Sequence, residues 1–180
     1  LSKVESKTLE YLIGRGGLTR LLLASDLRAT RKSARIWERI FADHAEQNAH
    51  RQPRYYFGTF TCDEGNMSDR QPVVRLKYLQ RKVDKVLRKL KLHGVQFAEL
   101  QGLANYPAGS AGRLIMIGIH VVFWCYGHFE PVKEAGKLNA SGAWKNKLGI
   151  PPVDFRPVSE LKGGLRGLAY YLNKPPHDAK

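Results

Sequence analysis

The sequence predicts an α+β protein in which an antiparallel β-sheet carries helices packed on one face. Two observations predict this fold class. Segments of alternating aromatic and β-branched residues are separated by a long segment whose apolar residues recur every three or four positions. From residue 53 onward the order of elements is strand, helix, strand, strand, strand and helix, which is typical of one sheet covered by helices.

The N-terminal part of the chain has a helical pattern. Apolar residues recur at spacings of three and four within residues 9–13 and again within 36–41. The Gly-Arg-Gly-Gly run at 14–17 lacks the Lys-Ser/Thr ending of a phosphate-binding loop and follows no strand, so a turn between two helices is favoured. We therefore expect a helical N-terminal extension over residues 1–52 and a separate domain over residues 53–180.

The expected strands of this domain cover residues 54–62, 95–101, 114–127 and 153–158. A short loop of small residues joins the second and third strands, which should therefore pair in antiparallel fashion. A helix follows Pro72, and Gly94 is its expected stop because glycine adopts the left-handed conformation readily. We expect a polar loop over residues 128–150 and a final helix over residues 159–173.

The chain is strongly basic. It has 30 Lys and Arg residues against 16 Asp and Glu, a formal net charge of +14. This charge favours a polyanionic partner, and nucleic acid is favoured over a membrane because no polybasic tail flanks a lipid-like anchor. The helix after Pro72 carries eight Lys or Arg residues between 75 and 91 and one acid, Asp84, so we expect it to contact DNA phosphates. The alternative is a solvated helix surface.

Cysteine usage and hydropathy indicate a cytoplasmic protein with no membrane partner. Cys62 and Cys125 stand in strand-like segments, which suits buried, reduced thiols. The longest apolar stretch, residues 114–125, is too short to span a bilayer, and the first residues have no secretory pattern. Because the chain begins with Leu1, we expect it to be a piece of a longer one.

Two neighbouring strands carry a candidate metal site. Side chains alternate across a strand, so His120 shares a face with Gly118 and Val122. Glu99 is the acid of the neighbouring strand, and a carboxylate and an imidazole on paired strands can hold Mg²⁺ or Mn²⁺. The alternative is a half-buried histidine and an exposed glutamate that never meet.

The final helix carries a candidate nucleophile. Tyr171 and Lys174 are three residues apart and share a helical face, so a phenol would lie beside an ammonium group. A phenol becomes nucleophilic when a metal, a cation or a base stabilises its phenolate. The alternatives are that the tyrosines pack onto the sheet and that Lys174 complements the helix dipole.

Three short motifs in this order resemble those of the HUH endonuclease family, replication initiators and relaxases that nick single-stranded DNA. FGTFT at 57–61 resembles the first motif, GIHVVFW at 118–124 the second and YLNK at 171–174 the third. The resemblance covers residues 54–176. The family's second motif has two histidines, and here Gly118, which has no donor atom, replaces the first of them.

The resemblance implies a metal site and a sheet of the HUH or ferredoxin-like type. Glu99 and His120 would hold Mg²⁺ or Mn²⁺ with water and with help from Gln101 or His128. Because Gly118 supplies no ligand, the metal affinity should be reduced. RNA-recognition modules and ferredoxins share this architecture, so the fold class alone does not assign a function.

The resemblance also implies a nicking and joining reaction in plasmid or rolling-circle replication initiation. Tyr171 would attack a phosphodiester to form a 5′-phosphotyrosine, Tyr170 would be the reserve nucleophile, and Lys174 would steady the phenolate. The partner would be single-stranded DNA at the nick and a duplex or hairpin origin around it. Two alternatives stay open: an inactive HUH-fold module that binds DNA at an origin or regulatory site, which Gly118 favours, and an RNA-recognition-like protein.

Overall fold

The structure is a computed structural model that describes residues 27–61, 66–67, 72–104, 113–145 and 150–173. The chain divides into two compact units. The helical unit combines Leu1–Arg51 with Ser159–Lys180, and the sheet unit is Gln52–Val158. The division predicted from the sequence lies one residue later, after residue 52, and the prediction that residues 159–180 share a domain with the sheet differs from this division.

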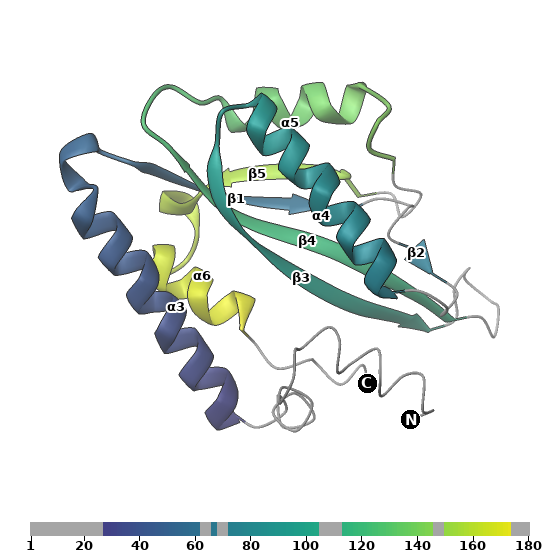
Figure 1. Cartoon of the computed structure of the whole chain (residues 1–180), viewed down its shortest axis with the longest axis horizontal. Helices are drawn as coiled ribbons and strands as arrows, with labels where there is room; N and C mark the ends of the chain where they lie inside the picture. The colour runs from purple at the N-terminus through teal and green to yellow at the C-terminus, as the bar shows by residue number, and fades with distance from the viewer. Residues whose placement is uncertain (1–26, 62–65, 68–71, 105–112, 146–149, 174–180) are drawn as a thin grey trace. The chain divides into compact units, whose positions relative to one another are not determined.

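The sheet unit has the order strand, short strand, helix, strand, strand, helix, strand (Figure 1). Its elements are β1 (Arg54–Phe60), β2 (Asn66–Met67), α4 (Pro72–Lys89), β3 (His93–Ala104), β4 (Arg113–Cys125), α5 (Pro131–Ala140) and β5 (Val153–Pro157). The strands lie side by side as β3-β4-β1-β5, each antiparallel to its neighbour, and β2 pairs with β4 beyond the end of β1. This is the split βαβ arrangement of ferredoxin-like folds, which confirms the predicted α+β class.

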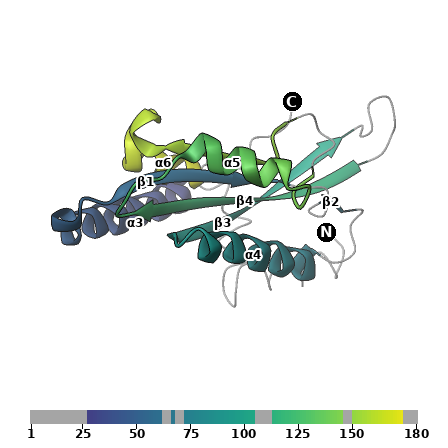
Figure 2. The same cartoon turned by 90° about the horizontal axis from the view of Figure 1, so that it is seen from above.

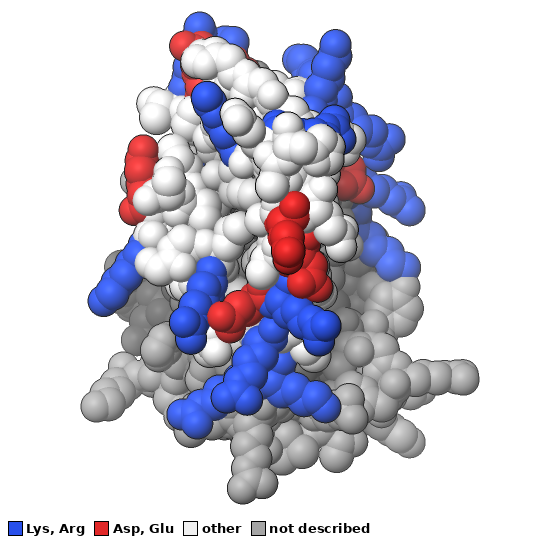
Figure 3. Space-filling model, turned by 90° about the vertical axis from the view of Figure 1, so that its left-hand side faces the viewer, with Lys and Arg blue, Asp and Glu red and all other residues white. Residues whose placement is uncertain are grey.

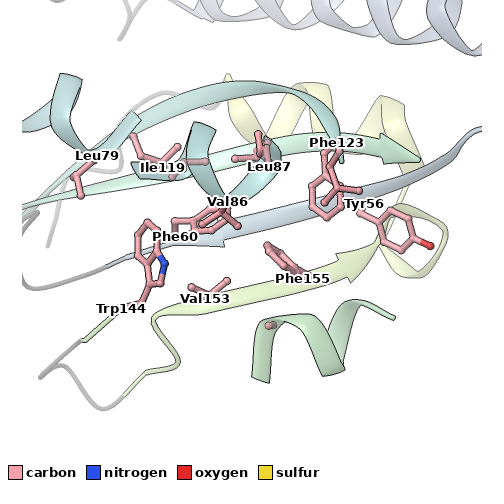
Figure 4. Close-up of a cluster of buried hydrophobic side chains, with 14 of the residues drawn as sticks. Tyr56, Phe60, Leu79, Val86, Leu87, Ile119, Phe123, Trp144, Val153 and Phe155 are labelled. Carbon is pink, nitrogen blue, oxygen red and sulfur yellow. The ribbon is translucent and has the colours of Figure 1, made fainter. Parts of the chain in front are cut away.

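One face of the sheet carries the hydrophobic core (Figure 4). Apolar residues of α4 at spacings of three and four, including Leu79, Val83 and Val86, pack against the sheet. The members that β4 contributes are Ile117, Ile119, Val121 and Phe123. Because side chains alternate along a strand, the even-numbered residues of β4 point to the opposite face. We call this the open face because α4 and α5 pack on the other one, although His120 and Val122 on it are buried, with exposed fractions of 8% and 0%.

A helix, α5, occupies part of the region for which the sequence analysis expects a polar loop, and that expectation is wrong. Pro131 begins the helix, where its missing N–H costs nothing, and Lys137 pairs with Glu134 at 2.6 Å one turn apart. Asn139 bonds both the N–H and the carbonyl of Val153, each at 2.9 Å, and so ties α5 to β5. Trp144 is buried against Phe60, because the chain after α5 returns to the core.

Gly94 does not end helix α4. The helix ends at Lys89, and Lys91 takes the positive φ of 54° that was expected at the glycine. Gly94 lies in β3, where an added Cβ would stand 2.9 Å from Phe123 Cβ and 2.9 Å from the carbonyl oxygen of Val122. The glycine therefore permits the close approach of β3 to β4.

The helical unit contains α3 (Leu27–Gln47), the 3₁₀ turn η1 (Ala49–Arg51) and α6 (Gly164–Leu172). Ser33 Oγ donates to Asn173 Oδ1 at 2.6 Å, and Arg166 pairs with Glu38 at 3.1 Å. The final helix begins at Gly164 and not at 159, because the chain first makes the 3₁₀ turn η3 (Val158–Glu160). The expected turn at 14–17 lies outside the described residues.

We predict that Gly94→Ala destabilises the sheet unit by about 1–3 kcal/mol, because the new methyl group has no room against Phe123. The matched control is Gly136→Ala on α5, where an added Cβ meets nothing within 4 Å. That change should raise stability by about 0.5–1 kcal/mol, because alanine favours a helix. Urea unfolding followed by circular dichroism measures both, and equal effects of the two substitutions would contradict the packing argument.

Candidate functional site

Glu99 and His120 meet on the open face of the sheet. Glu99 lies directly opposite Gly118 in the β3–β4 register, so His120 is its diagonal neighbour. Glu99 Oε2 lies 2.6 Å from His120 Nε2. The alternative in which these two side chains never meet is therefore wrong.

Strand β1 holds the other side of the imidazole. Thr59 is paired with His120 in the register, and its Oγ1 lies 3.3 Å from His120 Nδ1. The ring of Phe57 stacks on the imidazole with centroids 5.2 Å apart and an interplanar angle of 22°. With side chains from β1 and β3 around it, the imidazole is held in one orientation and is only 8% exposed.

The Thr59 hydroxyl can hydrogen-bond to either neutral tautomer of the His120 imidazole. In the first, Nε2–H donates to Glu99 and the Thr59 hydroxyl donates to Nδ1. In the second, Nδ1–H donates to the Thr59 oxygen and leaves the Nε2 lone pair available to a cation. A hydroxyl both donates and accepts, so Thr59 can support the ring in either arrangement, as the outer partner of a metal-binding histidine does.

Glu99 and His120 are the two side chains of this site that could hold a cation, although in the structure they contact each other at 2.6 Å. Their oxygen and nitrogen donors are of the kind that Mg²⁺ and Mn²⁺ accept. Within the described ranges no group of three or more His, Cys, Asp or Glu residues could hold a metal ion. His128 belongs to no such group and lies 3.8 Å from Glu130, and the side chain of Gln101 is outside the described part. Mg²⁺ often keeps several waters and shares its remaining positions with a substrate phosphate, so two protein donors can suffice.

Gly118 leaves room for a side chain beside this pair. It lies opposite Glu99 and two residues before His120 on the same face of β4. An added Cβ would stand 3.6 Å from Thr61 Cγ2 and 4.0 Å from the carbonyl oxygen of Phe60, which are ordinary contacts. The backbone around residue 118 therefore leaves room for a side chain, and the second imidazole is missing because the residue at this position is glycine.

The two candidate nucleophiles lie on α6, in the helical unit. Tyr170 is 37% exposed and Tyr171 is 44% exposed, while Leu168 and Ala169 on the same helix are buried. Adjacent helical residues point about 100° apart, so one phenol at a time can face a given point. The two units are described separately, so the meeting of Tyr171 with Glu99 and His120 stays a prediction, and Lys174 lies outside the described residues.

Aromatic residues also line the open face, and those of β1 have no role among the candidate site residues predicted from the sequence. Tyr55 lies beside Trp124 with ring centroids 6.3 Å apart, and His93 stacks on Trp124 at 6.5 Å. Burial, and secondarily the charge of Tyr126, raises the pKa of Tyr55, so this phenol stays protonated near neutral pH and is a poor nucleophile. Alternation within residues 54–60 is the signal that could have placed Tyr55 and Phe57 on one face.

No protein-family model, curated protein or solved structure matches the chain. None of the helices in the described part is both long and apolar enough to cross a membrane. The HUH resemblance therefore stays a prediction from the three sequence motifs and their order.

We predict that Thr59→Val lowers the free energy of unfolding by about 1 kcal/mol and shifts the ring-nitrogen NMR signals of His120, because the imidazole loses its hydroxyl partner. Thr61→Val, just after the end of β1, is the matched control, since the Thr61 hydroxyl donates instead to the Pro152 carbonyl oxygen. Long-range ¹H–¹⁵N spectra would show the shift. His120 signals that stay unchanged in Thr59→Val would contradict the assignment.

Proposed function

We propose that this chain is a replication-initiator-like DNA endonuclease and strand transferase that nicks single-stranded DNA through Tyr171. The observation that carries the proposal is the set of three side chains, Glu99, His120 and Thr59, on three neighbouring strands of one sheet. The motif that resembles the HUH family supplies His120, and the fold brings a carboxylate to the same place. The cation would be Mg²⁺ or Mn²⁺.

The residues of the site have different roles in the proposed reaction. Thr59 orients the imidazole, and Glu99 and His120 present an oxygen and a nitrogen to one point on the open face. A divalent cation, when bound, supplies positive charge that stabilises the transition state at a phosphodiester. Stacking from Phe57 keeps the ring from turning away.

Tyr171 would carry the covalent step. Its hydroxyl gives up its proton and its oxygen bonds to phosphorus. The bond from phosphorus to the 3′ oxygen breaks, and the released oxygen takes up a proton to become a 3′-hydroxyl. Lys174 would stabilise the phenolate, Tyr170 would be the reserve nucleophile, and reversal of the same step would join strands.

The charge of the chain supports DNA as the partner, because a net charge of +14 attracts a polyanion. Lys and Arg side chains project from much of the side drawn in Figure 3, with fewer acidic side chains among them. We propose a cytoplasmic setting and a duplex or hairpin origin around the nick, as in plasmid or rolling-circle replication.

A second function is an inactive module that binds DNA at an origin or regulatory site. The observation that favours it is the donor set. Gly118 stands where the family has a histidine, and Glu99 and His120 bond each other directly. Such a protein would retain the basic surface and lack the covalent step.

The test of the first function is a covalent protein–DNA adduct. We expect the wild type, incubated with a randomised pool of single-stranded oligonucleotides and Mn²⁺, to give an adduct on a denaturing gel. Tyr171→Phe should abolish it, Tyr170→Phe should keep it, and Glu99→Gln should lower its rate about tenfold or more. A wild type that shifts DNA on a native gel without any adduct would support the inactive module instead.

We predict that Gly118→His raises Mn²⁺ affinity about tenfold or more, because a second imidazole then stands opposite Glu99. The matched control is Gly127→His, at an exposed glycine with nothing within 4 Å of an added Cβ. Isothermal titration calorimetry measures both affinities. If the two variants bind Mn²⁺ equally, then Glu99 and His120 do not form the cation site.

A further inference from the structure

Helix α4 has a buried apolar side and an exposed basic side. Leu79, Val83 and Leu87 are buried in the core. The exposed basic residues of the helix and its end are Arg75, Lys77, Arg81, Lys85, Arg88, Lys89 and Lys91. We call these seven residues the α4 basic face. The packing against the sheet leaves them directed to solvent.

Three cations of this face, Arg81, Lys85 and Arg88, form no ion pair with the acid of their own helix. Asp84, the acid of the helix, accepts a hydrogen bond from Gln96 Nε2 at 2.5 Å. Among the residues that the structure describes, Arg81, Lys85 and Arg88 form no ion pair. Helix α5 contrasts with α4, because there Lys133 and Lys137 each pair with a glutamate at 2.6 Å. Within the described part of the chain, the side chains of Arg81, Lys85 and Arg88 are therefore available to an anionic partner.

The spacing of these cations forms a stripe. Arg81, Lys85 and Arg88 follow one another at four and three residues, so they lie on one side of the helix and are separated along its axis by about 6 Å and about 4.5 Å. The helix is held rigidly by its buried side, so these charges occupy fixed positions. Cations at fixed positions in a row can contact successive phosphates along a stiff nucleic-acid backbone.

The α4 basic face and the Glu99–His120 pair lie on opposite sides of the sheet. Helix α4 packs against the face that carries Ile119 and Phe123, whereas His120 points to the open face. Figure 2 shows α4 running beside β3 on one side of the sheet. In Figure 3, basic side chains project along the right-hand edge, the side on which α4 lies. One nucleic-acid strand cannot lie against both surfaces at once without wrapping around an edge of the sheet.

The residues of the α4 basic face favour the phosphates of a nucleic-acid duplex over a single strand or a membrane surface. Single-strand sites combine charge with aromatic platforms for the bases, and among the described side chains of α4 the one exposed aromatic residue is Tyr78. A membrane-binding helix inserts an apolar side, and the apolar side of α4 is buried in the core. A duplex needs neither feature, because its affinity for protein comes largely from the phosphates.

We propose that the α4 basic face binds the phosphate backbone of duplex DNA, independently of sequence, on the side of the sheet opposite the nicking site. The inference rests on the proposed function for the choice of DNA as the polyanion. It assigns the duplex to α4 and leaves the open face of the sheet to the single strand. Arg81, Lys85 and Arg88 are the central contacts.

The test compares two triple variants of equal charge in the full chain. Arg81→Gln/Lys85→Gln/Arg88→Gln removes three cations from the α4 basic face, and Lys133→Gln/Lys137→Gln/Lys145→Gln removes three exposed cations elsewhere. Fluorescence anisotropy with a labelled duplex at several salt concentrations measures affinity. We expect the α4 variant to lose about tenfold or more in affinity and to lower the slope of log K against log salt by about 2–3, and the control to change little. Circular dichroism checks that both variants fold.

Each other outcome overturns the inference in a distinct way. Equal losses in both triple variants would show a general charge effect. An α4 variant that keeps duplex affinity but loses binding to phosphatidylserine vesicles would assign the surface to a membrane, and one that loses only single-strand affinity would assign it to single strands. The adduct assay on short single-stranded oligonucleotides tests the nicking function separately. Its failure, with duplex binding lost in the α4 variant alone, would overturn the nuclease and leave the duplex surface standing.

Discussion

The alternation of side chains along β4 is the constraint on which the rest of the sheet unit depends. Its odd-numbered residues from Ile117 to Phe123 are buried in the core that α4 and α5 cover. Because the period of a strand is two, this burial directs His120 to the open face. A slip of one residue in the pairing would place the imidazole under α4 and move four large apolar side chains to the opposite face. Burial of the odd-numbered apolar side chains therefore fixes the direction of the His120 side chain, although the imidazole is not part of the apolar core.

The same alternation separates two kinds of surface. The open face carries the polar set around His120 together with aromatic rings from β1, β3 and β4. The covered face places the basic side of α4 outward, because the apolar side of the helix is used in the core. A sheet with helices on one face therefore offers aromatic and hydrogen-bonding chemistry on one side and a rigid row of charges on the other. Single-strand binding uses aromatic side chains on which the bases stack, whereas duplex binding depends largely on positive charge that contacts the phosphates.

The meeting of Glu99 and His120 could be predicted from the sequence, and the contact from Thr59 that supports the imidazole could not. The histidine stands in an apolar strand and the glutamate in the next, so a two-residue period and one hairpin suffice to bring them together. Thr59 arrives from β1, which is separated from β4 in sequence by a helix and two strands. Nothing in the local pattern of residues 57–61 distinguishes Thr59 from Thr61, and only the register with β4 shows which hydroxyl reaches the ring. The meeting of this site with Tyr171 stays a prediction.

The sequence by itself determined the charge of the chain, the alternation in β1 and β4 and the amphipathic character of α4, because each depends on composition or on a short local period. Tertiary structure alone decided that Gly94 serves a close approach to Phe123 and that Asn139 joins α5 to β5. It also decided that α6 groups with α3. Each of these features is a contact between segments that are far apart in the sequence. The free energy of such a contact depends on both segments, so the local pattern of one segment does not predict it.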